Sequence, residues 1–331
     1  MPKRKAFFAG FLLIFCFQNY STYYYLPFQP QQRFYPKKLR GSKIDSVKVL
    51  LGKRLFFDSI MSRDYSLSCA SCHFPKKAFT DGKVKSVGIR QQQVGRNAPS
   101  LANVVFQDSG FHWDRGVPSL EMQILVPVQE HNEFDFDLGL IAERMKRDSI
   151  YLSLCETAFQ DEPNPFAITQ SIACFERTII SNQSKFDRYM SGEFYALNAS
   201  EKKGMKLFFE ELSCSKCHSG ENFSNFSLQN NGLYKLAYPY DSGRMRITGL
   251  EKDRDKFKVP SLRNIAITYP YMHDGSLEDL NQVIDHYAHG GKIHPNKSQY
   301  IKSFDIDQKE KDHLIDFFNS LTDSAFLLKK Y

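Results

Sequence analysis

Two nine-residue stretches, "LSCASCHFP" at 67–75 and "LSCSKCHSG" at 212–220, decide the fold of this chain. Each contains the pattern Cys-x-x-Cys-His, and 145 residues separate Cys69 of the first copy from Cys214 of the second. A structural zinc site takes four ligands at compact, finger-like spacing, and a thioredoxin-like dithiol needs no histidine after its second cysteine. Cys-x-x-Cys-His is instead the arrangement that attaches haem c.

In this arrangement the two thiols form thioethers with the haem, and the histidine that follows places its imidazole on the iron. A single copy in a long chain is weak evidence, but two copies with long loops around them are a specific signal. We therefore predict two covalently bound haem c groups. The predicted attachment residues are Cys69, Cys72, Cys214 and Cys217, and the predicted proximal ligands are His73 and His218.

The composition is that of a globular protein: 42% of the 331 residues are hydrophobic and 24% are charged, with a net charge of +7. No long lysine or arginine tract follows the first residues, so we do not expect nucleic-acid binding. Residues 1–22 join a basic start to a short apolar run, which is typical of an export signal. We expect a periplasmic protein, with an uncleaved or lipidated membrane anchor as the alternative, and a polar tether at 23–40.

Helical periodicity dominates the rest of the chain, and the irregular stretches at 74–118 and 219–275 are too long for ordinary connections. Ser200 is the expected N-cap of one helix, and Gly290 and Gly291 are the expected stop of another. Cys155 and Cys174 are interpreted as small buried residues rather than a disulfide. The predicted helices lie at 139–159, 167–181, 200–212, 277–289 and 308–321.

The predicted fold is mainly α, with two cytochrome-c-like haem domains, long irregular loops and little strand. Each motif follows a helical segment that contains Leu-Phe-Phe, at 55–57 and 207–209, which is weak evidence for a duplicated unit. The predicted domains are 41–195, which carries the first motif, and 196–331, which carries the second.

From Leu51 to Leu321 the chain resembles the bacterial dihaem cytochrome c peroxidase family, including its MauG-like members. The family implies an enzyme that reduces H₂O₂ to water with electrons from a small cytochrome c or cupredoxin, and a homodimer. Its first haem is the peroxidatic one and its second collects electrons. Beyond the haem motifs, the resemblance rests on "GKRLFFD" (52–58), "GRNAPSLANVVF" (95–106), "FHWDRG" (111–116), "FKVPSLRNIAITYPYMHDGS" (257–276) and "HYAHGG" (286–291).

The resemblance implies three catalytic residues in the first half. Trp113, the one tryptophan of the chain, matches a family tryptophan between the two haems. Gln123 matches a distal glutamine, and Glu133 matches the catalytic glutamate, which moves a proton from one peroxide oxygen to the other. Glu121 and Glu130 compete for this role by residue type, but only Glu133 has the matching spacing.

The sequence departs from many family members at the first haem. Where they carry a removable distal histidine, this chain has Ile89, in "SVGI" at 86–89. Isoleucine cannot bind iron, so the resemblance implies a haem with an open face. His112 and His131 are the alternative ligands, and His131 is the more serious rival because it lies two residues before Glu133.

At the second haem the resemblance implies Tyr287 as the sixth ligand, in a position where many family members have methionine. Met272, Met245, His286 and His289 are the alternatives. An implied Ca²⁺ site between the haems uses Asn97 with the backbone carbonyls of Thr268 and Pro270, and oxygen ligands suit this cation. His273 matches a family histidine near the electron-entry haem, and Arg244 and Arg263 are expected partners of haem propionates.

Three functions follow from this reading. The first is a dihaem c-type peroxidase. The second is a MauG-like enzyme that uses peroxide to oxidise side chains of a partner protein, which Ile89 and Tyr287 both favour. The third is a non-catalytic dihaem electron carrier, which requires a side chain to close the first haem.

Overall fold

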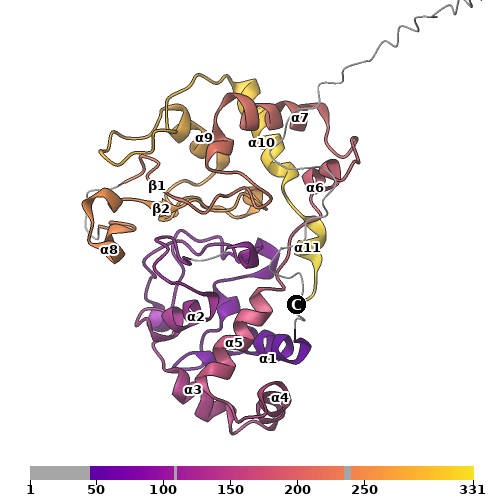
Figure 1. Cartoon of the computed structure of the whole chain (residues 1–331), viewed down its shortest axis with the longest axis vertical. Helices are drawn as coiled ribbons and strands as arrows, with labels where there is room; N and C mark the ends of the chain where they lie inside the picture. Colours follow the sequence, from indigo (N-terminus) through magenta and orange to yellow (C-terminus); the bar gives the residue numbers. More distant parts are fainter. Residues whose placement is uncertain (1–44, 108–109, 235–239) are drawn as a thin grey trace, which may run out of the picture.

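The computed structural model describes residues 45–107, 110–234 and 240–331. The predicted export signal or anchor and the predicted tether lie outside these residues. The chain forms two helical lobes, one above the other (Figure 1). Strand is confined, in the described ranges, to the antiparallel pair of β1 (Leu228–Gln229) and β2 (Phe257–Lys258). The predicted mainly α fold with little strand is confirmed.

The N-terminal lobe is built on the crossing of its first and last helices. At the crossing, a Cβ on Gly52 would lie 1.8 Å from the carbonyl oxygen of Ser171, so only glycine lets the two backbones meet. Leu51, Leu55 and Phe56 are fully buried beside it. The helices of this lobe are α1 (Ser46–Phe57), α2 (Leu120–Gln129), α3 (Leu138–Met145), α4 (Ser149–Phe159) and α5 (Pro165–Glu176).

The C-terminal lobe repeats this crossing. A Cβ on Gly204 would lie 1.9 Å from the carbonyl oxygen of His313, and Phe208 and Phe317 pack beside the contact with ring centroids 5.3 Å apart. Its helices are α6 (Lys185–Met190), α7 (Ala199–Lys206) with a π-helical turn at Leu207–Glu211, α8 (Met245–Thr248), α9 (Leu280–Ala288) and α10 (Gln308–Ser320).

The internal repeat extends well beyond the haem motifs. Asn103 and Asn264 each open a 3-10 turn in the left-handed conformation, with φ of 62° and 60°. Further along, Phe111 bridges Val117 in one lobe, and Tyr271 bridges Leu277 in the other. Helices α2 and α9 each begin three residues after their bridge. The two lobes are therefore copies of one structural unit.

The packing divides the chain differently from the predicted boundary at 195. Phe186 of α6 lies in the C-terminal core, and Phe326 of α11 (Ser324–Leu328) lies in the N-terminal core. Asp323 holds this last helix in place, because its Oδ2 accepts hydrogen bonds from the backbone N–H groups of Asn182 and Gln183, both at 2.9 Å. Helix α11 thus links the C-terminal lobe to the N-terminal lobe on one side of the molecule (Figure 1).

Local details differ from the predicted helices. The helix predicted at 139–159 is two helices, α3 and α4. Asp148 lies between them and caps the start of α4 with its side chain. The N-cap of α7 is Asn198, in a capping box with Glu201, so the predicted N-cap Ser200 is wrong. Cys155 and Cys174 are free thiols, which confirms the prediction against a disulfide.

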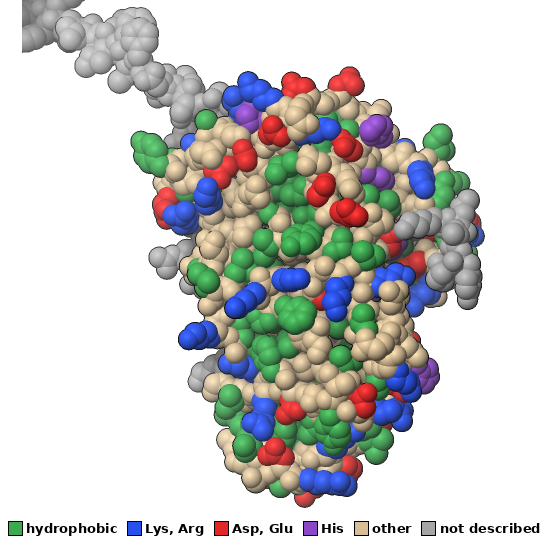
Figure 2. Space-filling view, turned by 180° about the vertical axis from the view of Figure 1, so that it is seen from behind, with side chains coloured by type: hydrophobic (Ala, Val, Ile, Leu, Met, Phe, Trp, Pro, Cys, Tyr) green, Lys and Arg blue, Asp and Glu red, His purple; other side chains and the backbone are tan. Residues whose placement is uncertain are grey.

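None of the helices in the described ranges is long and apolar enough to cross a membrane. Charged side chains of both signs occur on both lobes of the face seen in Figure 2, as expected for a mildly basic surface.

Candidate functional site

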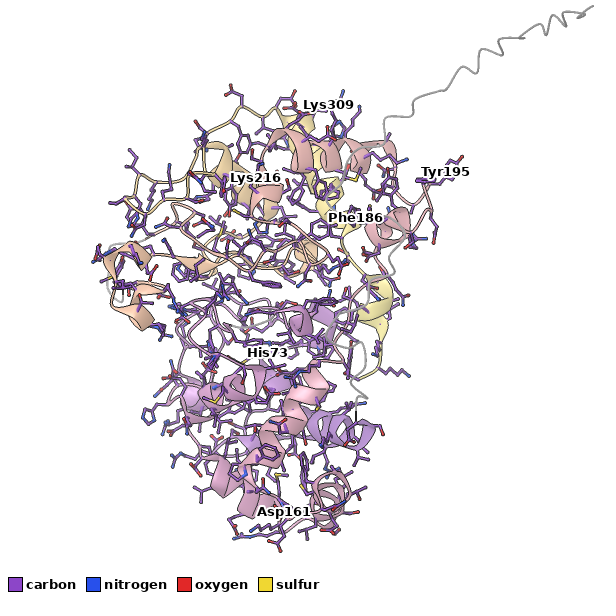
Figure 3. The ribbon with its side chains drawn as sticks, in the orientation of Figure 1. His73, Asp161, Phe186, Tyr195, Lys216 and Lys309 are labelled. Carbon is purple, nitrogen blue, oxygen red and sulfur yellow. The ribbon has the colours of Figure 1, made fainter. Side chains whose placement is uncertain are left out.

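The first Cys-x-x-Cys-His motif forms a 3-10 turn, Cys69–Ser71, in the lower lobe, where Figure 3 labels His73. The Nδ1 of His73 lies 2.8 Å from the carbonyl oxygen of Phe79 and donates to it. A histidine held in this way keeps its Nε2 for a metal. Burial lowers the pKa of His73, which keeps the ring neutral. With the free thiols of Cys69 and Cys72 beside it, this arrangement fits a covalently attached haem.

The second motif repeats the arrangement in the upper lobe, where Figure 3 labels Lys216 between the two cysteines. The Nδ1 of His218 lies 3.1 Å from the carbonyl oxygen of Phe223, and burial lowers the pKa of His218 to about 4. Phe223 and its counterpart Phe79 both adopt the left-handed conformation, so the same turn presents both histidines. This motif therefore fits a second haem equally well.

Glu133 is half-buried, in a loop beside the segment that contains Ile89. The backbone N–H of Ile89 donates to the carbonyl oxygen of Glu133 at 2.9 Å. A Cβ on Gly88 would lie 1.9 Å from the carbonyl oxygen of Asn132, so glycine is needed for this close approach. Burial, with a smaller effect from the charge of Glu130, raises the pKa of Glu133 to about 7. A carboxyl with this pKa can both accept and donate a proton near neutral pH.

The competing glutamates are placed differently. Glu121 forms an ion pair with Arg177 at 2.6 Å, and Glu130 is exposed. Of the three, only Glu133 combines burial with a raised pKa. The side-chain oxygen of Gln123, on α2, is buried and has no hydrogen-bond partner among the described residues. A buried amide oxygen without a partner is costly, which is consistent with a ligand completing this site.

His131 does not face a haem cavity. Its side chain is 89% exposed, and its Nδ1 lies 2.8 Å from a carboxylate oxygen of Asp135. His131 is therefore wrong as an alternative ligand of the first haem, although it lies only two residues from Glu133.

Trp113 lies at the contact between the lobes. Its indole Nε1 donates to the carbonyl oxygen of Asn97 at 2.9 Å, and the backbone N–H of Asn97 donates to the carbonyl oxygen of His273 at 2.9 Å. On its other side, the carbonyl oxygen of Trp113 accepts from the backbone N–H of Lys258 at 2.6 Å. Trp113 is thus hydrogen-bonded to the C-terminal lobe in two ways, directly at Lys258 and through Asn97 at His273.

Arg96 fastens the same interface. Its guanidinium binds both carboxylate oxygens of Asp241 at 2.6 and 2.8 Å and reaches Asp114 at 2.8 Å. Arg246 also pairs with Asp114, at 2.7 Å. A bidentate arginine–carboxylate pair of this kind fixes the relative orientation of its two side chains. Arg96 lies in the stretch at 95–106, but no local pattern predicts its role, because its partners are distant in the sequence.

The two arginines predicted to bind propionates have protein partners in this structure. Arg244 donates to the backbone carbonyls of Asp114 and Arg115, at 3.1 and 2.7 Å. Arg263 is buried and forms a bidentate pair with Asp187, with both contacts at 2.8 Å. These contacts give both residues structural roles, so the predicted propionate contacts gain no support.

The candidate ligands of the second haem meet at Asn231. The Asn231 Nδ2 lies 3.3 Å from the hydroxyl of Tyr287 and 3.5 Å from the sulfur of Met272. Burial raises the pKa of Tyr287, and the thiols of the second motif add to the effect, so its ring lies near them. His286 uses its Nε2 on the carbonyl oxygen of Asn231, at 2.9 Å. Tyr287 and Met272 both remain candidates, and no sequence motif pointed to Asn231.

His289 is exposed and donates to the backbone carbonyl of Asp285 at 2.6 Å, so it is not placed to bind the second haem. The predicted Ca²⁺ site lies at the interface, where the side-chain nitrogen of Asn97 donates to the carbonyl oxygen of Lys83 at 2.8 Å. This contact turns the amide nitrogen of Asn97 to the protein and leaves its oxygen as the atom for a cation. Pro270 lies three residues from His273, which Asn97 contacts.

The comparisons with known proteins agree on one family. A family model described as di-haem cytochrome c peroxidase matches residues 46–194. The methylamine utilization protein MauG of Methylorubrum extorquens is 35% identical over 295 residues, which cover 88% of this chain and 82% of that protein. The cytochrome c551 peroxidase of Nitrosomonas europaea is 34% identical and covers 82% and 79% of the two chains.

Among solved structures, a MauG-like protein associated with microbial copper homeostasis is similar with a TM-score of 0.81 and 31% identity. The match covers 94% of this chain and 97% of that one. The diheme peroxidase BthA of Burkholderia thailandensis, at 20% identity and a TM-score of 0.75, supports the fold alone.

Proposed function

This chain belongs to the di-haem cytochrome c peroxidase family, and from that premise we propose that it reduces hydrogen peroxide to water at its N-terminal haem. The overall reaction consumes one peroxide, two electrons and two protons and yields two water molecules. The observation that carries the proposal is the half-buried carboxyl of Glu133, whose pKa is raised to about 7, in a loop hydrogen-bonded to Ile89.

A member of this family carries two haems, and we propose that both are haem c, attached through Cys69 and Cys72 in one lobe and Cys214 and Cys217 in the other. When bound, the haem iron supplies the peroxide-binding site and the electrons. The protein supplies the proton chemistry. Glu133 would take a proton from one peroxide oxygen and return it to the other, departing oxygen. The buried side-chain oxygen of Gln123, which has no hydrogen-bond partner among the described residues, would orient the substrate.

Ile89 keeps this site available for substrate. It occupies the position where many relatives have a removable ligand, its side chain is apolar, and it is 2% exposed. The exposed position of His131 removes the rival that the electron-carrier function needs most. Both observations favour an enzyme over a carrier.

The haem of the second motif would supply the entry point for electrons, and Trp113 would relay them between the lobes. The hydrogen-bonded chain from Trp113 through Asn97 to His273 supports this route, because it joins the lobes without a gap. The electron donor is a small cytochrome c or cupredoxin in the periplasm. A homodimer and a Ca²⁺ ion at Asn97, Thr268 and Pro270 complete the proposal.

Steady-state turnover tests the function. The holoprotein is mixed with reduced cytochrome c and H₂O₂, and oxidation of the cytochrome is followed by absorbance. Two cytochromes should be consumed per peroxide. No oxidation with any small cytochrome or cupredoxin, while peroxide still reacts with the holoprotein, would contradict electron-donor-driven peroxide reduction.

A MauG-like activity is the second candidate, and Tyr287 favours it. Tyr287 supports it because its hydroxyl lies 3.3 Å from the Nδ2 of Asn231, beside the second motif, where a tyrosine oxygen could bind that haem. Such an enzyme would oxidise side chains of a partner protein and show little turnover with cytochrome c. Peroxide consumption that is slow with cytochrome c but rapid with a protein substrate would favour this alternative.

A further inference from the structure

His112 carries a buried polar atom that the proposed mechanism does not use. Its Nε2 is shielded from solvent and has no hydrogen-bond partner among the described residues. Burial, together with the positive charges of Arg96 and Arg246, lowers the pKa of His112 to about 4 despite the opposing effect of Asp114. The ring is therefore neutral at physiological pH. A buried nitrogen without a partner is costly, so its retention calls for an explanation.

The internal repeat gives His112 a counterpart in the other lobe. His112 and Met272 are 160 residues apart, and each follows the first residue of a matching bridge. The bridging backbone N–H bonds of Phe111 and Tyr271 have the same length, 2.7 Å. His112 and Met272 also share the left-handed conformation, with φ of 65° and 76°. The two side chains therefore leave equivalent points of equivalent turns.

Met272 shows where such a side chain points. Its sulfur lies 3.5 Å from the Nδ2 of Asn231, which also lies 3.3 Å from the hydroxyl of Tyr287. Met272 and Cys214 pack against the same C-terminal core, and the thiols of the second motif affect the pKa of Tyr287, so this group of side chains lies near that motif. By the same spacing of 160 residues, Tyr287 corresponds to Pro127 of α2. The side chain of Pro127 offers no atom that binds iron.

We propose that His112 is a third polar side chain of the cavity over the first haem motif, and that its Nε2 hydrogen-bonds peroxide bound there alongside Gln123 and Glu133. The proposal rests on the proposed peroxide reduction at this lobe. Gln123 supports it independently, because this residue follows on α2 and also has a buried atom without a partner. Two unpartnered polar groups on one short segment point to one small polar ligand.

His112 acts here as a substrate contact and not as an iron ligand. The position that corresponds to Tyr287 holds Pro127, and Ile89 fills the second position from which relatives bind the metal. Neither position thus supplies a side chain that binds iron in place of peroxide. Peroxide would then provide the hydrogen-bond partner that the neutral imidazole of His112 lacks. No electron or atom is transferred to His112.

The test uses the holoprotein with both haems and cyanide as a probe, because cyanide binds at an open iron position and accepts or donates one hydrogen bond. Cyanide affinity is measured by absorbance for the wild type, His112→Phe, His112→Gln and the matched surface control His131→Phe. Phenylalanine tolerates the left-handed backbone, as Phe79 and Phe223 show.

We expect His112→Phe to weaken cyanide binding about tenfold, the effect of losing one buried hydrogen bond. His112→Gln should restore most of the affinity, and His131→Phe should bind as the wild type does. The rate of the peroxide reaction should fall in the same order.

Equal cyanide affinity and peroxide rate in His112→Phe and wild type would overturn the proposal while leaving the proposed function intact. Conversion of a low-spin to a high-spin haem in His112→Phe would also overturn it, by making His112 a ligand. If the wild type binds neither cyanide nor peroxide, the proposed function itself fails.

Discussion

Replacing Glu133 by glutamine removes the proton-transfer group with almost no change in shape. The pKa of this carboxyl is raised from 4.5 to about 7, mainly by burial. Since one pKa unit corresponds to about 1.4 kcal/mol, holding Glu133 ionised costs the folded protein about 3 kcal/mol. The protein tolerates this cost at a group that can act near neutral pH, where a general acid–base residue contributes roughly 10²- to 10⁴-fold.

We therefore expect Glu133→Gln to lower kcat/KM for peroxide by about 10²- to 10⁴-fold with both haems still attached. The wild-type kcat/KM should rise with pH through about 7, because the deprotonated carboxyl accepts the peroxide proton. The variant should lack this rise. The assay is cytochrome c oxidation between pH 5 and 8, with haem content checked by absorbance.

Glu130→Gln is the matched control. It removes an exposed charge that adds to the raised pKa of Glu133. We expect near-normal activity and a rise in kcat/KM displaced to lower pH. Turnover of Glu133→Gln within threefold of the wild type at pH 7, or an unchanged pH profile, would refute the assignment of Glu133.

Stability gives an independent readout of the same group. Because the folded state holds the proton of Glu133 more tightly than the unfolded state does, stability should fall as pH rises from 4.5 through about 7. Glu133→Gln should lack this part of the pH dependence. Thermal unfolding curves of variant and wild type that stay parallel across this window would contradict the raised pKa.

Three other predictions follow from the packing and the interface. Trp113→Phe removes the hydrogen bond to Asn97 and should slow electron transfer between the haems on the order of tenfold, a barrier increase of about 1.4 kcal/mol. Stopped-flow absorbance measures this rate, and an unchanged rate argues against the relay. Gly52→Ala should destabilise the fold by about 1–3 kcal/mol, because its Cβ would clash at 1.8 Å, and an unchanged melting temperature would show that the helices can separate. Tyr287→Phe should alter the low-spin spectrum of the second haem while Met272→Leu does not, and the reverse result would make methionine the ligand.

The haem motifs were sufficient to predict the fold class, because covalent attachment requires a local spacing that the sequence displays directly. Most of the internal repeat could not be predicted from the sequence, because the two lobes share backbone conformations more than they share residue types. Asn103 and Asn264 are the exception: "PSLAN" and "PSLRN" are visible in the sequence at 99–103 and 260–264. Helix α2 was not predicted, because Pro127 lies inside it and weakens the helical pattern.

The site residues divide in the same way. Glu133 and Ile89 were assigned from the family resemblance, and the structure brings their backbones into contact. The surroundings of His131, Arg263 and Asn231 depend on partners distant in the chain, which a single sequence does not reveal. Asp187, for example, lies 76 residues before Arg263 and occupies its guanidinium.

We propose that one haem is open to peroxide and the other is not. EPR of the oxidised holoprotein, before and after one equivalent of H₂O₂, tests it most directly. We expect one high-spin and one low-spin haem, with the high-spin signal lost on addition of peroxide. Two low-spin haems that do not respond to peroxide would contradict it.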